Sequence, residues 1–135
     1  MMEWTLSCSE RDAIDSFYDH PRVQGLAEMM NFVGTINGDP QVVEKIVASQ
    51  AHHKKIDGHA PDLKGNDLNA YIAAGVYSDH ECHDLADAIA KLERGQFIMI
   101  REGTAARNLE ALVPLLCDKY VERCMFCTDD KHPND

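Results

Sequence analysis

The feature that most constrains the fold of this chain is a regular alternation between short apolar runs and helical patterns. The apolar runs are Val23–Glu28, Lys54–His59, Val76–Asp79, Phe97–Arg101 and Arg123–Cys127. The helical patterns are Glu10–Tyr18, Asp39 to about His52, Asn66–Ala74, Leu85–Arg94 and Ala105–Tyr120. Such alternation predicts βα units around a parallel sheet. We therefore expect a single α/β domain over residues 1–135, either a barrel portion or an open layer.

Local signals set several helix boundaries. Asp39-Pro40 is a typical helix start, with Asp as N-cap and Pro in the first helical position. Gly95 is expected to close the helix that begins at Leu85. The segment MNFVGTINGD, residues 30–39, is expected to be a loop. Ala105–Tyr120 is expected to be one long helix with Leu109, Leu112, Val113 and Leu116 on one face.

Charge and composition exclude several classes of function. The chain carries 23 acidic and 13 basic residues, a net charge of −10, and an acidic chain is repelled by nucleic-acid backbones and anionic membranes. The N-terminal MMEWTLSCSE has neither the basic region nor the apolar region of a signal peptide. Apolar runs such as Phe97–Ile100 are too short to span a bilayer. We therefore expect a cytoplasmic protein that binds neither nucleic acid nor membranes.

The chain has five cysteines, at positions 8, 82, 117, 124 and 127. An odd number without a secretion signal argues against a disulfide framework. Cys124-x-x-Cys127 has the spacing of a redox pair or half a zinc site, but no second CxxC is present. The segment ERCMFC is instead interpreted as a buried strand, and its cysteines as core thiols.

Polar residues follow the apolar runs at the positions where the strands should end. They are Glu28, His59, His80, Glu102 and Asp129. The carboxyl ends of parallel strands share one edge, where ligand chemistry gathers in α/β proteins. Imidazole and carboxylate groups together suit a hydrolytic site for Zn, Mn or Fe. The alternative is that each residue separately caps a helix or hydrogen-bonds within a loop.

Longer sequence strings point to a family. GLAEMMNF, IDGHAP, LNAYIAAGVYSDHE, MIREGTAARNLEAL and TDDKHP resemble, in the same order, the bacterial-type adenine deaminases of the metal-dependent amidohydrolase superfamily. The similarity covers about residues 20 to 135. It implies the C-terminal part of a TIM barrel, here a partial barrel of about five βα units. It also implies a binuclear centre that usually holds Mn or Fe, with Zn as an alternative.

The resemblance assigns roles to individual residues. Glu28 matches the carboxylate that bridges the metals after barrel strand four, and it would also take part in catalysis. His59 and His80 match the histidine ligands after strands five and six. Asp129 matches the strand-eight aspartate that contacts metal and moves protons, with Asp130 as the alternative if the match shifts by one residue.

The implied reaction is hydrolytic deamination of adenine to hypoxanthine and ammonia, a step of purine salvage, by water that the metal activates. Glu81, Arg101 and Glu102 are expected in the wall of the pocket as substrate contacts. The zinc cytidine-deaminase arrangement is excluded, because H-x-E and P-C-x-x-C are absent. Another aminopurine remains an alternative substrate.

One part of the family pattern has no counterpart in this sequence. The complete centre needs an H-x-H pair after the first barrel strand, and no such triplet occurs. A TIM barrel has eight strands, whereas about five are expected here. The alternative function is therefore a non-catalytic α/β module that binds metal or purine and needs a homo-oligomer or a complementary chain to complete the barrel.

Overall fold

The computed structural model describes residues 10–134, and its centre is a single parallel sheet. Five strands pair in the order β1-β2-β3-β4-β5, with every neighbouring pair parallel. The strands are β1 (Gly25–Met29), β2 (Lys55–Gly58), β3 (Ser78–Asp79), β4 (Phe97–Arg101) and β5 (Cys124–Cys127). This arrangement confirms the predicted α/β fold and is that of a partial βα barrel.

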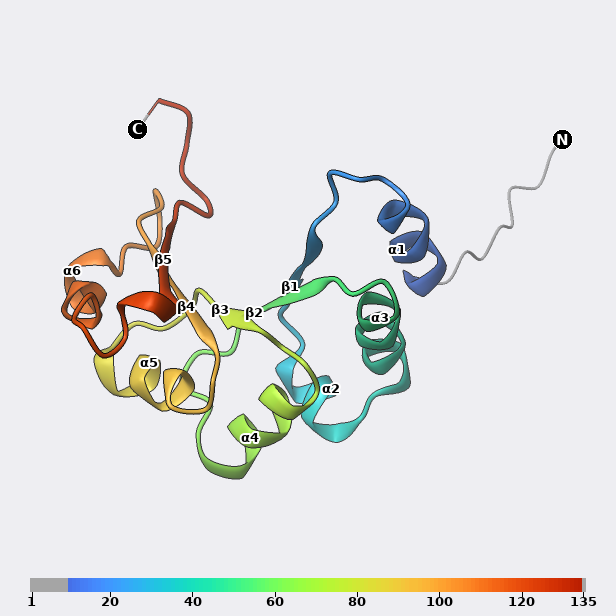
Figure 1. Cartoon of the computed structure of the whole chain (residues 1–135), viewed down its shortest axis with the longest axis horizontal. Helices are drawn as coiled ribbons and strands as arrows, with labels where there is room; N and C mark the ends of the chain where they lie inside the picture. The colour runs from blue at the N-terminus through green and yellow to red at the C-terminus, as the bar shows by residue number, and fades with distance from the viewer. Residues whose placement is uncertain (1–9, 135) are drawn as a thin grey trace, which may run out of the picture.

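Helices cover one side of this sheet. They are α1 (Glu10–Tyr18), α2 (Phe32–Asn37), α3 (Pro40–Ala51), α4 (Gly65–Ala73), α5 (Leu85–Leu92) and α6 (Leu109–Leu112). Figure 1 shows α2 to α6 along one side of the strands, while the described residues place no helix on the other. Two apolar clusters fill the space under the helices, the first around Ile56 and Leu68, the second around Ile98 and Leu112. The curved sheet is therefore packed on its outer face only.

The expected helix caps at Asp39 and Gly95 are confirmed. The Asp39 carboxylate accepts a hydrogen bond from the Gln41 amide at 2.9 Å, and Pro40 occupies the first helical position. Gly95 has φ 94°, a conformation that a residue with a Cβ rarely adopts, so the chain turns there directly into β4.

The prediction that residues 30–39 form a loop is wrong, because α2 lies inside this segment. The Asn31 side chain accepts a hydrogen bond from the Gly34 amide at 2.8 Å and thereby caps the start of the helix. Gly38, with φ 70°, ends it after six residues. A cap and a stop this close together leave too few residues for a helical repeat to show in the sequence.

The long helix predicted for Ala105–Tyr120 is also wrong. Residues 109–112 form a short helix, and Val113–Leu115 continue as a 3-10 turn that contains Pro114. Proline has no amide hydrogen and its ring clashes with the preceding helical turn. The 3-10 turn places Leu115 in the core and leaves Val113 45% exposed, so the supposed apolar stripe is split.

Strand β5 is not the buried strand that the sequence predicted. It is an edge strand of the described sheet, and Phe126 is 64% exposed. Only Cys82 is a fully buried core thiol among the described cysteines, whereas Cys124 and Cys127 are half-buried and Cys117 is exposed. These four thiols are free, and Cys8 lies outside the described residues.

The inner face of the sheet carries a shallow apolar pocket of ≈ 300 Å³ whose lining includes Leu26, Met99 and Met125. On the same face, at the amino-terminal ends of β3 and β4, Tyr77 stacks on Phe97 with 4.8 Å between ring centroids. Within residues 10–134 no helix has both the length and the apolar character needed to cross a membrane. The segment MMEWTLSCS, on which the expectation of no signal peptide rests, lies outside these residues.

Candidate metal centre

The sheet brings the candidate ligands to one edge. Glu28 lies near the end of β1, while His59 and His80 each directly follow a strand. Arg101 is the last residue of β4, and Asp129 lies two residues beyond β5. Because all five strands are parallel, these positions share the carboxyl edge of the sheet, as the sequence predicted.

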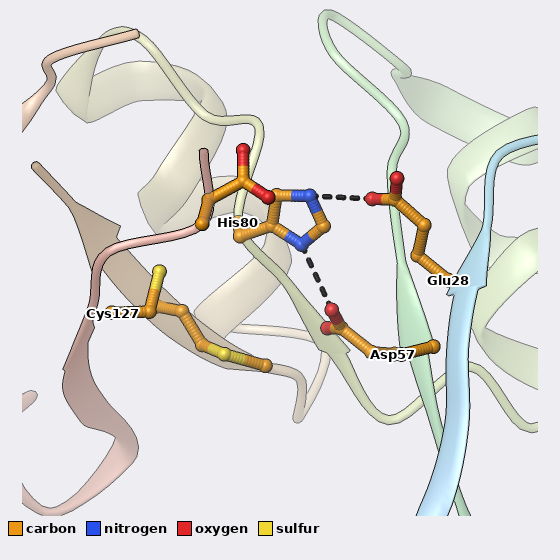
Figure 2. Close-up of a pocket in the computed structure, with 7 residues that line it drawn as sticks. Glu28, Asp57, His80 and Cys127 are labelled. Carbon is orange, nitrogen blue, oxygen red and sulfur yellow. Dashed lines mark hydrogen bonds and ion pairs between the residues drawn. The ribbon is translucent and has the colours of Figure 1, made fainter. Parts of the chain in front are cut away.

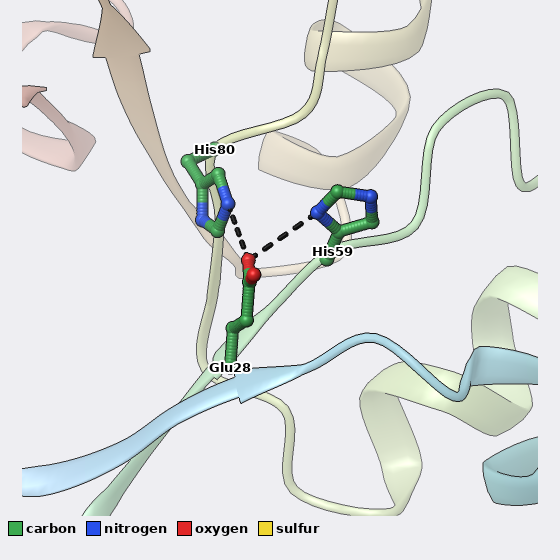
Figure 3. Close-up of side chains that lie close together, drawn as sticks. All are labelled: Glu28, His59 and His80. Atoms are coloured by element: carbon green, nitrogen blue, oxygen red, sulfur yellow. Dashed lines mark hydrogen bonds and ion pairs between the residues drawn. The ribbon is translucent and has the colours of Figure 1, made fainter. Parts of the chain in front are cut away.

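Glu28 lies between two imidazole rings. Its Oε2 is 2.6 Å from His80 Nε2 and 3.3 Å from His59 Nδ1 (Figure 3). One ligand atom from each of the three residues lies within 4.8 Å of the others. The His80 side chain is only 7% exposed, whereas those of Glu28 and His59 are 29% and 24% exposed. The cluster is thus anchored on a buried histidine and open toward solvent.

Asp57 holds the other side of the His80 ring. Its Oδ2 is 2.8 Å from His80 Nδ1, so the imidazole lies between two carboxylates (Figure 2). Ser78 Oγ donates to the second Asp57 oxygen at 2.6 Å. The hydrogen bond with Asp57 raises the pKa of His80, against the opposing effect of burial, and the charge of Glu28 adds to the increase. A carboxylate at Nδ1 orients the ring so that Nε2 points at a metal ligand position.

Sequence reasoning missed Asp57 as a functional residue. The signal was present, since Asp57 and His59 are two residues apart at the end of a strand and side chains at i and i+2 share a face. The strand-end pattern predicts site residues only at or beyond the last residue of each apolar run, and Asp57 lies inside the run Lys54–His59.

Arg101 joins two further acidic residues to this cluster. Its Nη1 is 2.5 Å from Glu81 Oε1 and 2.7 Å from Asp129 Oδ2. Glu81 Oε1 is also 3.6 Å from His59 Nδ1. His80, Glu81 and Asp129 form a second group whose ligand atoms lie within 4.8 Å of one another. Burial lowers the pKa of Arg101, but the hydrogen bonds with Glu81 and Asp129 outweigh this effect and raise the pKa above its usual value.

Two sequence candidates lie apart from the cluster. Glu102 donates its amide to the Cys127 carbonyl at 3.1 Å and forms a backbone bridge with Arg107, and it does not line the central pocket of the described residues. Asp130 accepts a hydrogen bond from the Ala105 amide at 2.8 Å, which lowers its pKa. Of the two adjacent aspartates, Asp129 is therefore the one that faces the cluster.

A pocket of ≈ 270 Å³ opens beside these groups. Its polar lining comprises Glu28, Asp57, His80 and Asp129, and Figure 2 shows Cys127 across the pocket from Glu28. Met99, Cys127 and Ala27 supply apolar surface. Such a pocket, with a few convergent polar groups on an apolar floor, is near the lower end of the size of small-molecule sites.

Fold and site together define a class: a βα barrel portion with histidines and carboxylates gathered at the carboxyl ends of its strands. Curated relatives over most of this chain carry the name adenine deaminase, and the chain belongs to that family. It is 53% identical over 119 residues to the protein of Desulfatibacillum aliphaticivorans, covering 88% of this chain and 21% of that protein. It is 56% identical over 111 residues to that of Dehalococcoides mccartyi strain BAV1, covering 82% and 19%, respectively.

A third relative, from Sulfurovum sp., is 50% identical over 124 residues, which covers 92% of this chain and 23% of the relative. The chain thus spans about a fifth of the length of the relatives it matches. No family profile matches the chain.

Proposed function

We propose that this chain supplies the metal-binding part of an adenine deaminase site, which converts adenine to hypoxanthine and ammonia in cytoplasmic purine salvage. The observation that carries the proposal is the Glu28 carboxylate between the His59 and His80 rings, with all three ligand atoms within 4.8 Å. The name carried by the relatives supplies the reaction and the substrate.

The donor set fits a divalent metal. Four carboxylates surround the two histidines: those of Glu28, Asp57, Glu81 and Asp129. Arg101 pairs with Glu81 and Asp129. Such an excess of negative charge favours a divalent cation, and mixed imidazole and carboxylate donors suit Mn and Fe as well as Zn. Glu28, His59, His80 and Asp129 are the proposed ligands of a binuclear centre. When bound, the metal would activate water for attack at neutral pH.

The remaining roles follow from where the side chains lie. Asp129 is 39% exposed beside the pocket, which suits a carboxylate that exchanges protons with a ring nitrogen or a leaving amine. Glu81 and Arg101 are proposed to contact the polar edge of adenine after exchanging their mutual ion pair for substrate. Glu102 is the weaker substrate candidate, because its backbone is bound to Cys127 and Arg107 and the residue does not line the pocket.

The first test is metal content per chain by elemental mass spectrometry, after expression with manganese and iron supplied. We expect about one metal or more per wild-type chain and none in a His59→Ala/His80→Ala variant. The matched control is His52→Ala/His83→Ala, which removes two exposed histidines that pair with Asp15 and Asp62 on the surface. Loss of metal in the control, or no metal in the wild type, would reject the site.

Activity is tested next, by measuring ammonia and hypoxanthine from adenine and from other aminopurines. Release from adenine that tracks metal content across the variants supports the deaminase. Release only from a different aminopurine would replace the substrate and keep the reaction class.

The alternative is a non-catalytic α/β module that binds metal or purine and needs a second chain. It is favoured by the apolar inner face around Met99 and Met125 and by the exposed edge strand β5. Metal uptake without turnover, together with a homo-oligomer or a longer co-purifying polypeptide in light scattering, would support this function instead.

A further inference from the structure

A buried ionic cluster lies directly beneath the candidate metal centre. Lys91 Nζ is 3.4 Å from Asp79 Oδ2 and 3.1 Å from Asp87 Oδ2, and all three side chains are 0% exposed. Lys91 comes from α5, whereas Asp79 ends β3 and immediately precedes His80. Charges this deeply buried are costly unless they are paired and hydrogen-bonded, so their placement needs a reason.

Asp79 uses both carboxylate oxygens to hold the two loops that carry the histidines. Oδ2 accepts a hydrogen bond from the Ala60 amide at 3.0 Å, next to His59. Oδ1 accepts one from the Glu81 amide at 2.8 Å, next to His80. A single side chain thus fixes the backbone beside both proposed histidine ligands.

Lys91 holds the same two loops from below. Its Nζ donates to the Ala60 carbonyl at 2.7 Å and to Cys82 Sγ at 3.4 Å. The Cys82 carbonyl in turn accepts from Asn108 Nδ2 at 2.5 Å. Both polar groups of the Ala60 backbone are therefore bound, one by Asp79 and one by Lys91.

We infer that the Lys91–Asp79 pair is a positioning device that sets the separation of the His59 and His80 loops and so the ligand spacing around Glu28. Neither residue touches the proposed metal or substrate, so their effect acts through the loop backbone. The inference deepens the proposed function and rests on it for its metal-binding part. Its loop-holding part depends only on the hydrogen bonds.

Asp87 provides a matched control within the same cluster. It is equally buried and pairs with the same Lys91 nitrogen, but its other oxygen, Oδ1, has no hydrogen-bond partner among the described residues. Asp87→Asn and Asp79→Asn therefore remove the same charge from the same lysine, and only Asp79→Asn disturbs the Ala60 and Glu81 amides. The isosteric Asn turns one acceptor oxygen into an NH₂ group that faces a backbone donor.

The experiment compares wild type, Asp79→Asn, Asp87→Asn and Lys91→Met by amide hydrogen exchange and by Mn²⁺ titration. In Asp79→Asn at least one of the two amides, that of Ala60 or that of Glu81, should exchange about tenfold faster or more, because it loses its bond to a charged acceptor. Core amides of Ile98 and Ile100 in β4 report global unfolding, and the loop effect is measured relative to them. The Mn²⁺ affinity should fall about 10- to 100-fold in Asp79→Asn and Lys91→Met, as for residues behind metal ligands.

Asp87→Asn should lower stability while keeping the loop protection and the Mn²⁺ affinity of the wild type. Equal effects of Asp79→Asn and Asp87→Asn on loop exchange would overturn the inference, as would unchanged Mn²⁺ affinity in Lys91→Met. If the wild type binds no Mn²⁺, the proposed function fails, and the exchange data alone still decide whether the pair holds the loops.

Discussion

Tyr71 offers a sharp test of how the fold holds the site. Its side chain is fully buried under the sheet, and its hydroxyl donates to the Met29 carbonyl at 2.7 Å. The same oxygen accepts from the His59 amide at 3.1 Å. One hydroxyl therefore ties the end of β1, beside Glu28, to the loop that carries His59. Burial raises the pKa of Tyr71, so the hydroxyl keeps its proton and remains a donor.

Tyr71→Phe removes both hydrogen bonds and leaves a buried carbonyl and an amide without partners. Each lost bond costs about 0.5–1.5 kcal/mol, and leaving a buried group unsatisfied moves the cost toward about 1–3 kcal/mol. For the two bonds together we expect a loss of about 2–4 kcal/mol in the free energy of unfolding. The assay is equilibrium urea unfolding of the metal-free chain, with the denaturant slope unchanged.

Tyr77→Phe is the matched control, since Tyr77 stacks on Phe97 at the opposite end of the strands from the site. We expect a change within about 0.5 kcal/mol there. A Tyr71→Phe variant no less stable than Tyr77→Phe would refute the argument that this hydroxyl links the two strand ends. The Mn²⁺ affinity should also fall in Tyr71→Phe and stay unchanged in Tyr77→Phe.

Three further predictions concern the site and the thiols. Asp57→Asn should weaken Mn²⁺ binding about 10- to 100-fold, measured by titration, because the His80 ring loses the carboxylate that orients it. Without metal, the chain should become less stable as the pH rises from about 6.5 through the raised pKa of His80, because the folded chain binds a proton at His80 more tightly than the unfolded chain does. The urea midpoint measured against pH should show this loss in the wild type and not in His80→Gln. Under native conditions iodoacetamide should label exposed Cys117 well before Cys82, whose burial raises its pKa, and peptide mapping that finds Cys82 labelled first would contradict the packing.

The alternation of apolar runs and helical patterns was sufficient to predict the parallel sheet, because strand period and strand-end chemistry are local properties. The placement of Glu28, His59 and His80 at one edge followed from parallel pairing alone. The prediction of one long helix was wrong because Pro114 interrupts the helix, although the apolar spacing of the leucines continues past it. The prediction that β5 is buried was wrong because the exposure of an edge strand depends on what packs against it, and no local sequence pattern contains that information.

The contacts that hold the site were beyond sequence reasoning for a different reason. Lys91 reaches the Ala60 carbonyl across 31 residues, and in the sequence it is one charged residue on a helix. A lysine at that position is expected on the solvated face, and only the tertiary packing of α5 against the strand ends shows that it is buried. Residues that touch a ligand follow strand ends, whereas residues that position them come from any element that packs beneath.

The charges around His80 explain why protonation and metal binding should exclude one another. Both ring nitrogens of His80 face carboxylate oxygens, Nδ1 toward Asp57 and Nε2 toward Glu28, an arrangement that matches the doubly protonated imidazolium. A proton on Nε2 would supply positive charge at the point where a metal would coordinate, while the hydrogen bond between Nδ1 and Asp57 would remain in either state. The same two carboxylates that raise the pKa of His80 would therefore also favour metal binding, and a proton and a metal ion would compete for Nε2.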